Sequence, residues 1–311
     1  MRVLVTGASG LLGRAVFAAF EASSHDVKGT AFSRASDRLV KLDLNDHEAV
    51  RCLLEDFKPQ IVVHCAAERR PDAVEASPEA ARRLNVQSTS YLASLAVTLS
   101  FTLIYISTDY VFPGSPPSEQ GYDVDDEPEP TNLYGHTKRD GEKVVLEARE
   151  KQGAKGTVLR VPVLYGPATA NSESAINVLL DVVRSSASKT KKAKMDDWAT
   201  RYPTHVGDIA RVLVDLADLS TRQGLPPILH FSSQTLFTKY TISRLFASLH
   251  TPPLDLDPEW FVRDAEGPKP GETVRPRDCH LSNAELDKLG IDTTATDFEG
   301  WFKEAIQNGN A

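Results

Sequence analysis

A glycine-rich turn near the N-terminus is the feature that most constrains how this chain can fold. A predicted strand at residues 2–6 leads into Gly7-Ala8-Ser9-Gly10-Leu11-Leu12-Gly13, and an amphipathic segment with helical spacing follows. Glycines let the backbone turn tightly and approach a pyrophosphate, and the free N–H groups of a helix N-terminus attract its charge. A strand, this turn and a helix in succession predict a dinucleotide-binding unit. The alternative interpretation is a plain structural turn.

Short apolar runs alternate with helical patterns through the first half of the chain. The runs are rich in Val, Ile, Leu and Phe and lie at residues 3–5, 27–32, 61–65, 101–107 and 157–164. Continuous apolar runs are typical of strands that are covered on both faces of a parallel sheet. The order of strands and helices therefore predicts an α/β fold of Rossmann type, with a doubly wound parallel sheet.

The second half of the chain is less regular, because Pro and Gly cluster between residues 251 and 276. Helical patterns near residues 176–183 and 206–219 and an apolar run at 228–232 remain. We expect residues 1–165 to form the dinucleotide-binding domain, joined by a returning segment near 204–235. A smaller C-terminal lobe for substrate or interaction would comprise residues 166–203 and 236–311.

Charge and cysteine content exclude several classes of function. Lys and Arg number 35 against 43 Asp and Glu, so the net charge is −8 and no broad nucleic-acid binding is expected. Cys52, Cys65 and Cys279 are widely spaced and the histidines have no paired ligand spacing, which predicts reduced thiols and no metal site. No apolar run is long enough to span a membrane, and we expect no signal peptide because the first predicted strand begins at residue 2. We expect a cytoplasmic protein, with a nuclear location left open.

The end of the second strand indicates which dinucleotide binds. NAD sites usually place an acidic residue about 20 residues after the glycines, where it bonds the ribose 2′-hydroxyl. Here the strand ends in Ala31-Phe32-Ser33-Arg34, with no acid at its tip. Arg34 can pair with a 2′-phosphate and Ser33 can donate a hydrogen bond to it, so the sequence predicts NADP. A solvated surface arginine is the alternative.

A tyrosine and a lysine four residues apart suggest proton-transfer chemistry. Tyr134 and Lys138 share one face of a predicted helix, and Thr108 ends a strand. A nearby ammonium lowers the pKa of a phenol, so that Tyr134 could exchange a proton with a carbonyl or hydroxyl group that Thr108 also bonds. Thr108, Tyr134 and Lys138 are therefore the candidate catalytic residues.

Two further segments are candidates for the cavity wall. Arg69 and Arg70 follow the strand at residues 61–65, and the carboxyl end of such a strand faces the ligand crevice. Residues 196–198 and 202–205 mix aromatic and polar side chains, and they could either line the lobe that faces the cofactor or serve as packing.

These motifs together resemble the extended short-chain dehydrogenase/reductase family, whose pattern is TGxxGxxG followed by YxxxK. Ser107-Thr108-Asp109-Tyr110-Val111-Phe112 and Asn132-Leu133-Tyr134-Gly135-His136-Thr137-Lys138 are similar to its dTDP-4-dehydrorhamnose reductase branch. Val63-His64-Cys65-Ala66-Ala67-Glu68-Arg69-Arg70-Pro71-Asp72 is similar to the regulatory beta subunits of methionine adenosyltransferase, as are Gly10-Leu11-Leu12-Gly13-Arg14 and Tyr202-Pro203-Thr204-His205-Val206.

The resemblance implies a Rossmann fold that binds NADP, and two functions. In the first, the protein modulates the methionine adenosyltransferase catalytic subunit, its partner, which makes S-adenosylmethionine. In the second, it is an NADPH-dependent reductase of a nucleotide-linked 4-keto sugar that uses Thr108, Tyr134 and Lys138. The implied cofactor contacts are Thr6, Gly7, Ser9, Gly10, Leu11, Leu12, Gly13, Phe32, Ser33, Arg34, Asp43, Leu44, Cys65, Ala66, Ala67, Arg69, Tyr134, Lys138 and Leu164.

The C-terminus departs from the animal regulatory subunits. Their tail is basic and aromatic and docks on the catalytic partner, whereas residues 301–311 here do not match that pattern. Two docking routes follow from this difference. Either Trp301 and Phe302 make a different tail contact, or the folded body docks alone.

Overall fold

A parallel sheet forms the centre of the computed structural model, which describes residues 1–34, 36–269 and 271–309. Within these residues the sheet has seven strands in the order β11-β6-β5-β4-β1-β2-β3. The strands are β1 (Arg2–Thr6), β2 (Asp26–Ala31), β3 (Leu39–Lys41), β4 (Ile61–His64), β5 (Thr102–Thr108), β6 (Lys155–Val161) and β11 (Ile228–His230).

The strand order places a topological switch point at β1. Val5 of β1 pairs in parallel with Gly29 of β2 on one side and with Val63 of β4 on the other. The chain leaves β1 toward one edge of the sheet and later returns to build the other, so a crevice opens at the carboxyl ends of the strands. The apolar runs of β1, β4 and β5 are buried because helices cover both faces. The predicted Rossmann-type α/β fold is confirmed.

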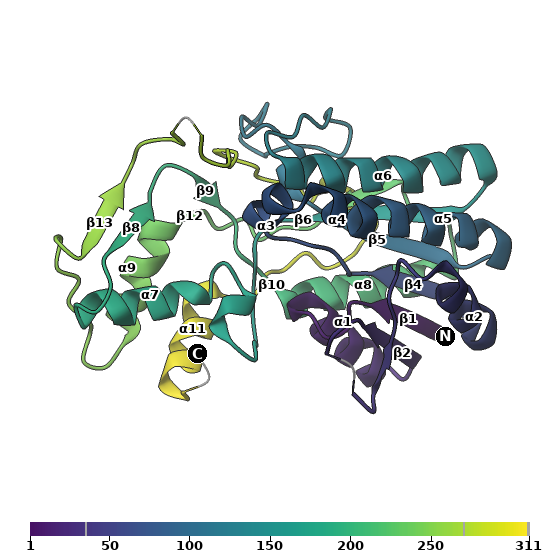
Figure 1. The fold of residues 1–311 in the computed structure, drawn as a ribbon, viewed down its shortest axis with the longest axis horizontal. Coiled ribbons are helices and arrows are strands. Elements are labelled where there is room, and N and C mark those ends of the chain that lie inside the picture. The colour runs from purple at the N-terminus through teal and green to yellow at the C-terminus, as the bar shows by residue number, and fades with distance from the viewer. Residues whose placement is uncertain (35, 270, 310–311) are drawn as a thin grey trace.

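Helices cover the two faces of the sheet (Figure 1). Helices α1 and α8 pack together on one face, and α2, α5 and α6 cover the other. Shorter helices α3 and α4 and a π-helical turn lead into α5. These elements are α1 (Leu11–Ala22), α2 (His47–Phe57), α3 (Pro71–Ala76), α4 (Pro78–Arg82), the π-helical turn (Arg83–Gln87), α5 (Ser88–Leu99), α6 (Leu133–Gln152) and α8 (Val206–Ser220).

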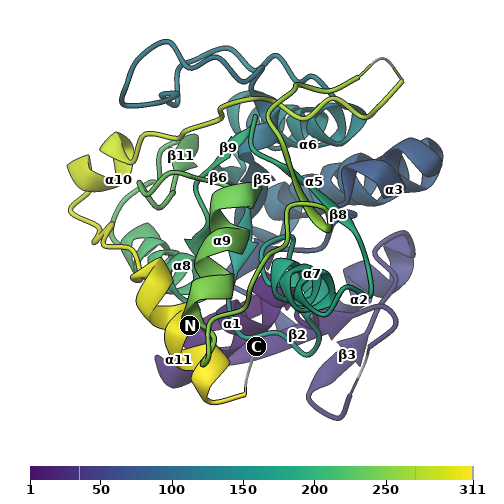
Figure 2. The same cartoon turned by 90° about the vertical axis from the view of Figure 1, so that its left-hand side faces the viewer.

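Most of the remaining elements lie beyond the carboxyl ends of the strands (Figures 1 and 2) and share a core of their own. The helices of this core are α7 (Val178–Ala187), α9 (Lys239–Leu249) and α11 (Phe298–Gln307), and a 3₁₀ turn at Asn171–Glu173 precedes α7. Helix α10 (Ala284–Lys288) packs instead beside β11, with Leu286 in the core of α1 and α8, and a second 3₁₀ turn, Asp109–Val111, follows β5. The strands pair as β7 (Leu164–Tyr165) with β10 (Thr204–His205), β9 (Thr200–Arg201) with β12 (Phe237–Thr238), and β8 (Ala193–Asp196) with β13 (Phe261–Asp264). The domain boundary near residue 165 stays a prediction.

The C-terminal helix α11 belongs to this second core. Phe298 and Phe302 are buried, and the ring of Tyr165 packs against both. Trp301 is partly buried, with its ring centroid 5.4 Å from that of Tyr165. The aromatic residues at the end of the chain therefore pack inside the molecule.

The described part of the chain contains no helix that is both long and apolar enough to cross a membrane. Over the same residues, no group of three or more His, Cys, Asp or Glu side chains could hold a metal ion. All three cysteines are free thiols.

Candidate functional site

One cavity of about 910 Å³ opens at the carboxyl ends of the strands, between the sheet and the second group of elements. It gathers nearly every residue that the sequence predicts for the site. Those that line it are Gly7, Ser9, Gly10, Leu11, Leu12, Gly13, Phe32, Ser33, Arg34, Asp43, Leu44, Cys65, Ala66, Ala67, Arg69, Thr108, Tyr134, Lys138 and Leu164.

The glycine turn forms one end of the cavity, and two of its glycines cannot be replaced without displacing backbone. Gly7 has φ +66°, and a Cβ atom there would lie 2.8 Å from the Cα of Ala66. A Cβ atom on Gly13 would lie only 2.2 Å from the carbonyl oxygen of Gly7. The turn therefore packs α1 directly onto the ends of β1 and β4, and it leaves an uncovered backbone cradle facing the cavity.

Thr6 differs from the prediction, because it is fully buried and does not line the cavity. Its Oγ1 lies 2.7 Å from Nδ1 of His64, and Nε2 of His64 lies 3.1 Å from Oγ1 of Thr89. Burial, and then the nearby Lys138 ammonium, lower the pKa of His64 to about 3. The buried His64 thus stays neutral and ties β1 and β4 to α5, so Thr6 supports the turn from below.

The tip of β2 forms the other side of this end of the cavity. The side chain of Phe32 is 66% exposed, although large apolar residues are usually buried. Its ring is thus available to pack against a planar base. Arg34 follows two residues later, and its guanidinium forms an ion pair with Glu173.

Glu173 is a cavity residue that the sequence reasoning missed. It lies in the 3₁₀ turn before α7, and Nη2 of Arg14 on α1 donates to its Oε2 at 2.6 Å. Partial burial acts to raise the pKa of this carboxyl, but hydrogen bonds from Arg14 and Arg34 lower it to about 2. No local pattern marks residue 173, because its two arginine partners are more than 130 positions away in sequence.

Thr108, Tyr134 and Lys138 all line the cavity. Thr108 ends β5, and the other two lie in the first turns of α6, whose N-cap Asn132 accepts a hydrogen bond from the Gly135 N–H at 2.9 Å. This cap starts the helix at the position that directs Tyr134 to the cavity. All three predicted residues therefore line one cavity, and their catalytic role stays a prediction.

The electrostatics of this group differ from the expectation that Lys138 lowers the pKa of Tyr134. Burial raises the pKa of the Tyr134 phenol, although contacts with Thr108 and Arg69 act to lower it. The Lys138 ammonium instead donates to the carbonyl oxygen of Ile106 at 2.7 Å. Burial also lowers the pKa of Lys138 to about 7, against the opposing charge of Glu142. Lys138 thus titrates near neutral pH in this structure.

Further cations line the cavity near Tyr110, whose ring centroid is 6.2 Å from that of Tyr134. Arg201 is buried below this ring, and within the described residues its Nη2 atom has no hydrogen-bond partner. Burial, followed by the charges of Arg201 and Arg275, lowers the pKa of Lys239 to about 8. The sequence reasoning missed these residues, since they come from separate segments of the second half.

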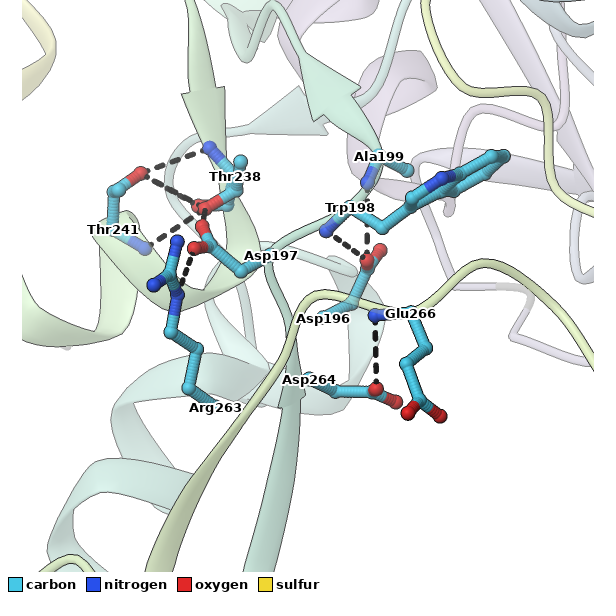
Figure 3. A network of polar contacts seen from close by, with 9 residues as sticks. All are labelled: Asp196, Asp197, Trp198, Ala199, Thr238, Thr241, Arg263, Asp264 and Glu266. Carbon is cyan, nitrogen blue, oxygen red and sulfur yellow. Dashed lines mark hydrogen bonds and ion pairs between the residues drawn. The ribbon is translucent and has the colours of Figure 1, made fainter.

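Residues 196–198 and 202–205, named as candidates for the cavity wall, do not line the cavity, although Arg201 between them does. Figure 3 shows Asp196 and Asp197 in a polar network beside β8. The Asp196 carboxylate accepts from the N–H groups of Trp198 and Ala199 at 2.9 and 3.1 Å. Asp197 accepts from Thr238 and Arg263. Asp197 thus connects β8 to β12 and β13, whereas Asp196 holds the local turn and its Oδ2 lies 3.9 Å from Nη2 of the cavity residue Arg201.

The fold and the cavity together define a Rossmann-type α/β protein with the architecture of reductases and epimerases. More particularly, the chain belongs to the RmlD substrate binding domain family, whose model matches residues 1–310. The predicted family resemblance is confirmed.

Two curated relatives and one solved structure illustrate these similarities. The chain is 43% identical over 310 residues to methionine adenosyltransferase 2 subunit beta of Mus musculus, covering 98% of this chain and 87% of that protein. It is 29% identical over 321 residues to dTDP-4-dehydrorhamnose reductase of Mycolicibacterium smegmatis, covering 100% and 85%. The crystal structure of dTDP-4-dehydrorhamnose reductase from Bacillus anthracis in complex with NADP has a TM-score of 0.78 at 22% identity, covering 99% and 98%.

Proposed function

We propose that this protein is an NADP-binding regulatory subunit of methionine adenosyltransferase that modulates the synthesis of S-adenosylmethionine. The observation that carries the proposal is the 43% identity to methionine adenosyltransferase 2 subunit beta across 98% of the chain. The identity to the curated dTDP-4-dehydrorhamnose reductase is lower, at 29%.

The shape and charge of the cavity support NADP as the cofactor. The tight turn from Gly7 to Gly13 places its backbone and the N-terminus of α1 at the cavity wall, where free N–H groups and the helix dipole favour a pyrophosphate. Arg34 and Ser33 would hold the 2′-phosphate, and the exposed ring of Phe32 would pack on the adenine. Bound NADP supplies a nicotinamide ring that can carry a hydride.

Leu164 and Cys65 line the same cavity as Tyr134 and Lys138. The hydroxyl of Tyr134 and the ammonium of Lys138 would hydrogen-bond the ribose next to the nicotinamide. We assign this binding role to residues 1–165 with the returning segment near 204–235. The remaining residues, 166–203 and 236–311, form the interaction lobe of the proposal.

The packing of α11 favours docking by the folded body over docking by a tail. Phe302 is fully buried and Trp301 is partly buried against Tyr165, so both side chains already contribute to the core of α11. We also propose a cytoplasmic location, because Cys52, Cys65 and Cys279 are all free thiols, as is usual in a reducing compartment.

Analytical ultracentrifugation with the methionine adenosyltransferase catalytic subunit of the same organism tests the proposal. We expect a complex at micromolar concentrations, and tighter association with NADP present. Binding must be reciprocal. If this chain changes the affinity of the catalytic subunit for a ligand by some factor, that ligand should change the affinity of the catalytic subunit for this chain by the same factor. Absence of a complex with and without NADP would overturn the regulatory assignment.

A second function is supported by the cations around Tyr110. Arg201, Lys239 and Arg275 could bind the diphosphate of a nucleotide-linked 4-keto sugar beside Thr108, Tyr134 and Lys138. In that case Tyr134 would donate a proton to the carbonyl oxygen while NADPH reduces the carbon. Tyr134→Phe should then lower turnover by about 10²–10⁴-fold and largely spare NADPH binding. No NADPH oxidation by the wild type across a panel of such substrates would exclude this function.

A further inference from the structure

A carboxylate lies where the dinucleotide-binding unit would be expected to hold a phosphate. Glu173 lines the cavity, and its side chain is only 12% exposed. Arg14 donates to Oε2 at 2.6 Å and to Oε1 at 3.3 Å, and Arg34 donates to Oε1 as well. The backbone N–H of Thr169 completes the set at 3.1 Å from Oε2. An anion is therefore already bound between two guanidinium groups.

The cations that hold Glu173 all come from the dinucleotide-binding unit. Arg14 lies in α1 directly after the glycine turn, and Arg34 follows β2. Arg69, which follows β4, donates to the backbone oxygen of Glu173 at 2.5 Å. Arginines from the segments that follow β1, β2 and β4 thus all contact Glu173. This residue belongs to the segment 166–177, which joins β7 to α7.

The segment 166–177 is anchored at both ends, so the position of Glu173 is defined. Ser174 Oγ donates to the Leu164 carbonyl oxygen at 2.7 Å, and Asn177 Nδ2 donates to the Gly166 carbonyl oxygen at 2.9 Å. Glu173 therefore connects the start of α7 to the predicted 2′-phosphate site across the cavity.

We propose that Glu173 is an internal competitor of the NADP 2′-phosphate, which must leave Arg34 when NADP binds and which sets the preference between NADP and NAD. The carboxylate and the 2′-phosphate are both anions that pair with the Arg34 guanidinium. Two anions bound next to each other at one guanidinium repel. NAD lacks the 2′-phosphate, so it binds without this exchange. The inference rests on the NADP site of the proposed function. It adds that Glu173, in the segment 166–177, controls which dinucleotide this site prefers.

A consequence concerns the second group of elements. Because Glu173 lies five residues before α7, its release from Arg34 removes one contact between the end of β2 and the segment that leads into α7. NADP and NAD would therefore leave the segment 166–177 in different states. A ligand can shift such an equilibrium only through its differential affinity for the two states, and the 2′-phosphate supplies that difference.

Calorimetry on Glu173→Gln tests the proposal. The variant keeps the size of the side chain and removes its charge, so NADP⁺ should bind roughly three- to tenfold more tightly than to the wild type. 2′,5′-ADP, which carries the 2′-phosphate without the nicotinamide half, should show the same gain. NAD⁺ affinity should change less than about twofold.

Glu21→Gln is the matched control. Glu21 also pairs with an arginine, Arg38, at 2.6 Å, but it does not line the cavity, so its neutralisation should leave both affinities unchanged. In the Arg34→Ala background, Glu173→Gln should increase the affinity for NADP⁺ by a smaller factor, because the guanidinium that both anions share has been removed. No gain for NADP⁺, or an equal gain for NAD⁺, would overturn the proposal.

Hydrogen exchange on the wild-type protein provides a second readout that needs no variant. NADP⁺ should increase exchange in the peptide containing Thr169, whose N–H donates to Glu173, and NAD⁺ should not. Unchanged or greater protection with NADP⁺ would contradict the release of Glu173. If the wild type binds NADP⁺ but forms no complex with methionine adenosyltransferase, only the regulatory assignment fails.

Discussion

The carboxylate of Glu142 on α6 receives two hydrogen bonds from the Arg160 guanidinium on β6, at 3.0 and 2.8 Å, in a fully buried ion pair. The hydroxyl of Ser107 on β5 also donates to Glu142. Lys138 precedes Glu142 by four residues on the same helix, so this pair fixes the rotation of α6 over the sheet. The placement of Tyr134 and Lys138 at the cavity depends on that rotation.

Loss of one partner of this pair should be costly. Glu142→Ala leaves the Arg160 guanidinium buried without a counter-charge, which should lower the free energy of unfolding by about 3–5 kcal/mol. Urea denaturation measures the change. Glu147→Ala on the same helix is the control, because Glu147 and its partner Lys151 are exposed, and its effect should stay below about 1 kcal/mol. Equal effects of the two substitutions would show that the buried pair does not anchor α6.

Arg34 should determine the preference for NADP. Arg34→Ala removes the guanidinium that would pair with the 2′-phosphate, so NADP⁺ should bind about tenfold or more weakly while NAD⁺ binding is nearly unchanged. Calorimetry with both cofactors tests this result. Arg38→Ala, at an exposed arginine that pairs with Glu21, serves as the control. Equal binding of NADP⁺ and NAD⁺ by the wild type would contradict the assignment.

The glycine turn should tolerate no side chain at Gly13. A Cβ atom there would lie 2.2 Å from the Gly7 carbonyl oxygen, so Gly13→Ala must displace the turn, weaken cofactor binding at least about tenfold and destabilise the fold. Gly224→Ala is the matched control, because nothing lies within 4 Å of a Cβ atom at that position. Thermal denaturation and cofactor titration on both variants would reveal whether the close approach matters.

The buried His64 should make the protein sensitive to acid. Burial lowers its folded-state pKa to about 3, whereas an unfolded histidine has a pKa near 6.5. Between these values the unfolded state binds one more proton than the folded state. The contribution of neutral His64 to the free energy of unfolding is therefore fully present above about pH 6.5 and is lost as pH falls toward 3. The slope for one such group is about 1.4 kcal/mol per pH unit.

Urea denaturation between pH 4 and pH 8 measures the contribution of His64. His64→Asn should unfold more easily than the wild type at pH 8, and the gap between the two proteins should narrow below about pH 6.5. A gap that stays constant across this range would show that His64 binds its proton equally in both states.

The amino-acid sequence by itself determined the features that depend on neighbouring residues. The turn from Gly7 to Gly13 follows from the conformational freedom of glycine, and the shared face of Tyr134 and Lys138 follows from helical spacing. The continuous apolar runs likewise fixed the parallel sheet and its two covered faces. These properties are local, so a single stretch of sequence carries them.

Only the tertiary structure decided which distant groups meet and how buried they are. Glu173 meets Arg14 and Arg34 because the segment 166–177 crosses the cavity, and Arg201 reaches Tyr110 from β9. Thr6 turned inward to His64, and the pKa of Tyr134 rose because the phenol is buried. Phe302 became part of the core of α7, α9 and α11. Burial and long-range ion pairing depend on the whole path of the chain, which no local spacing encodes.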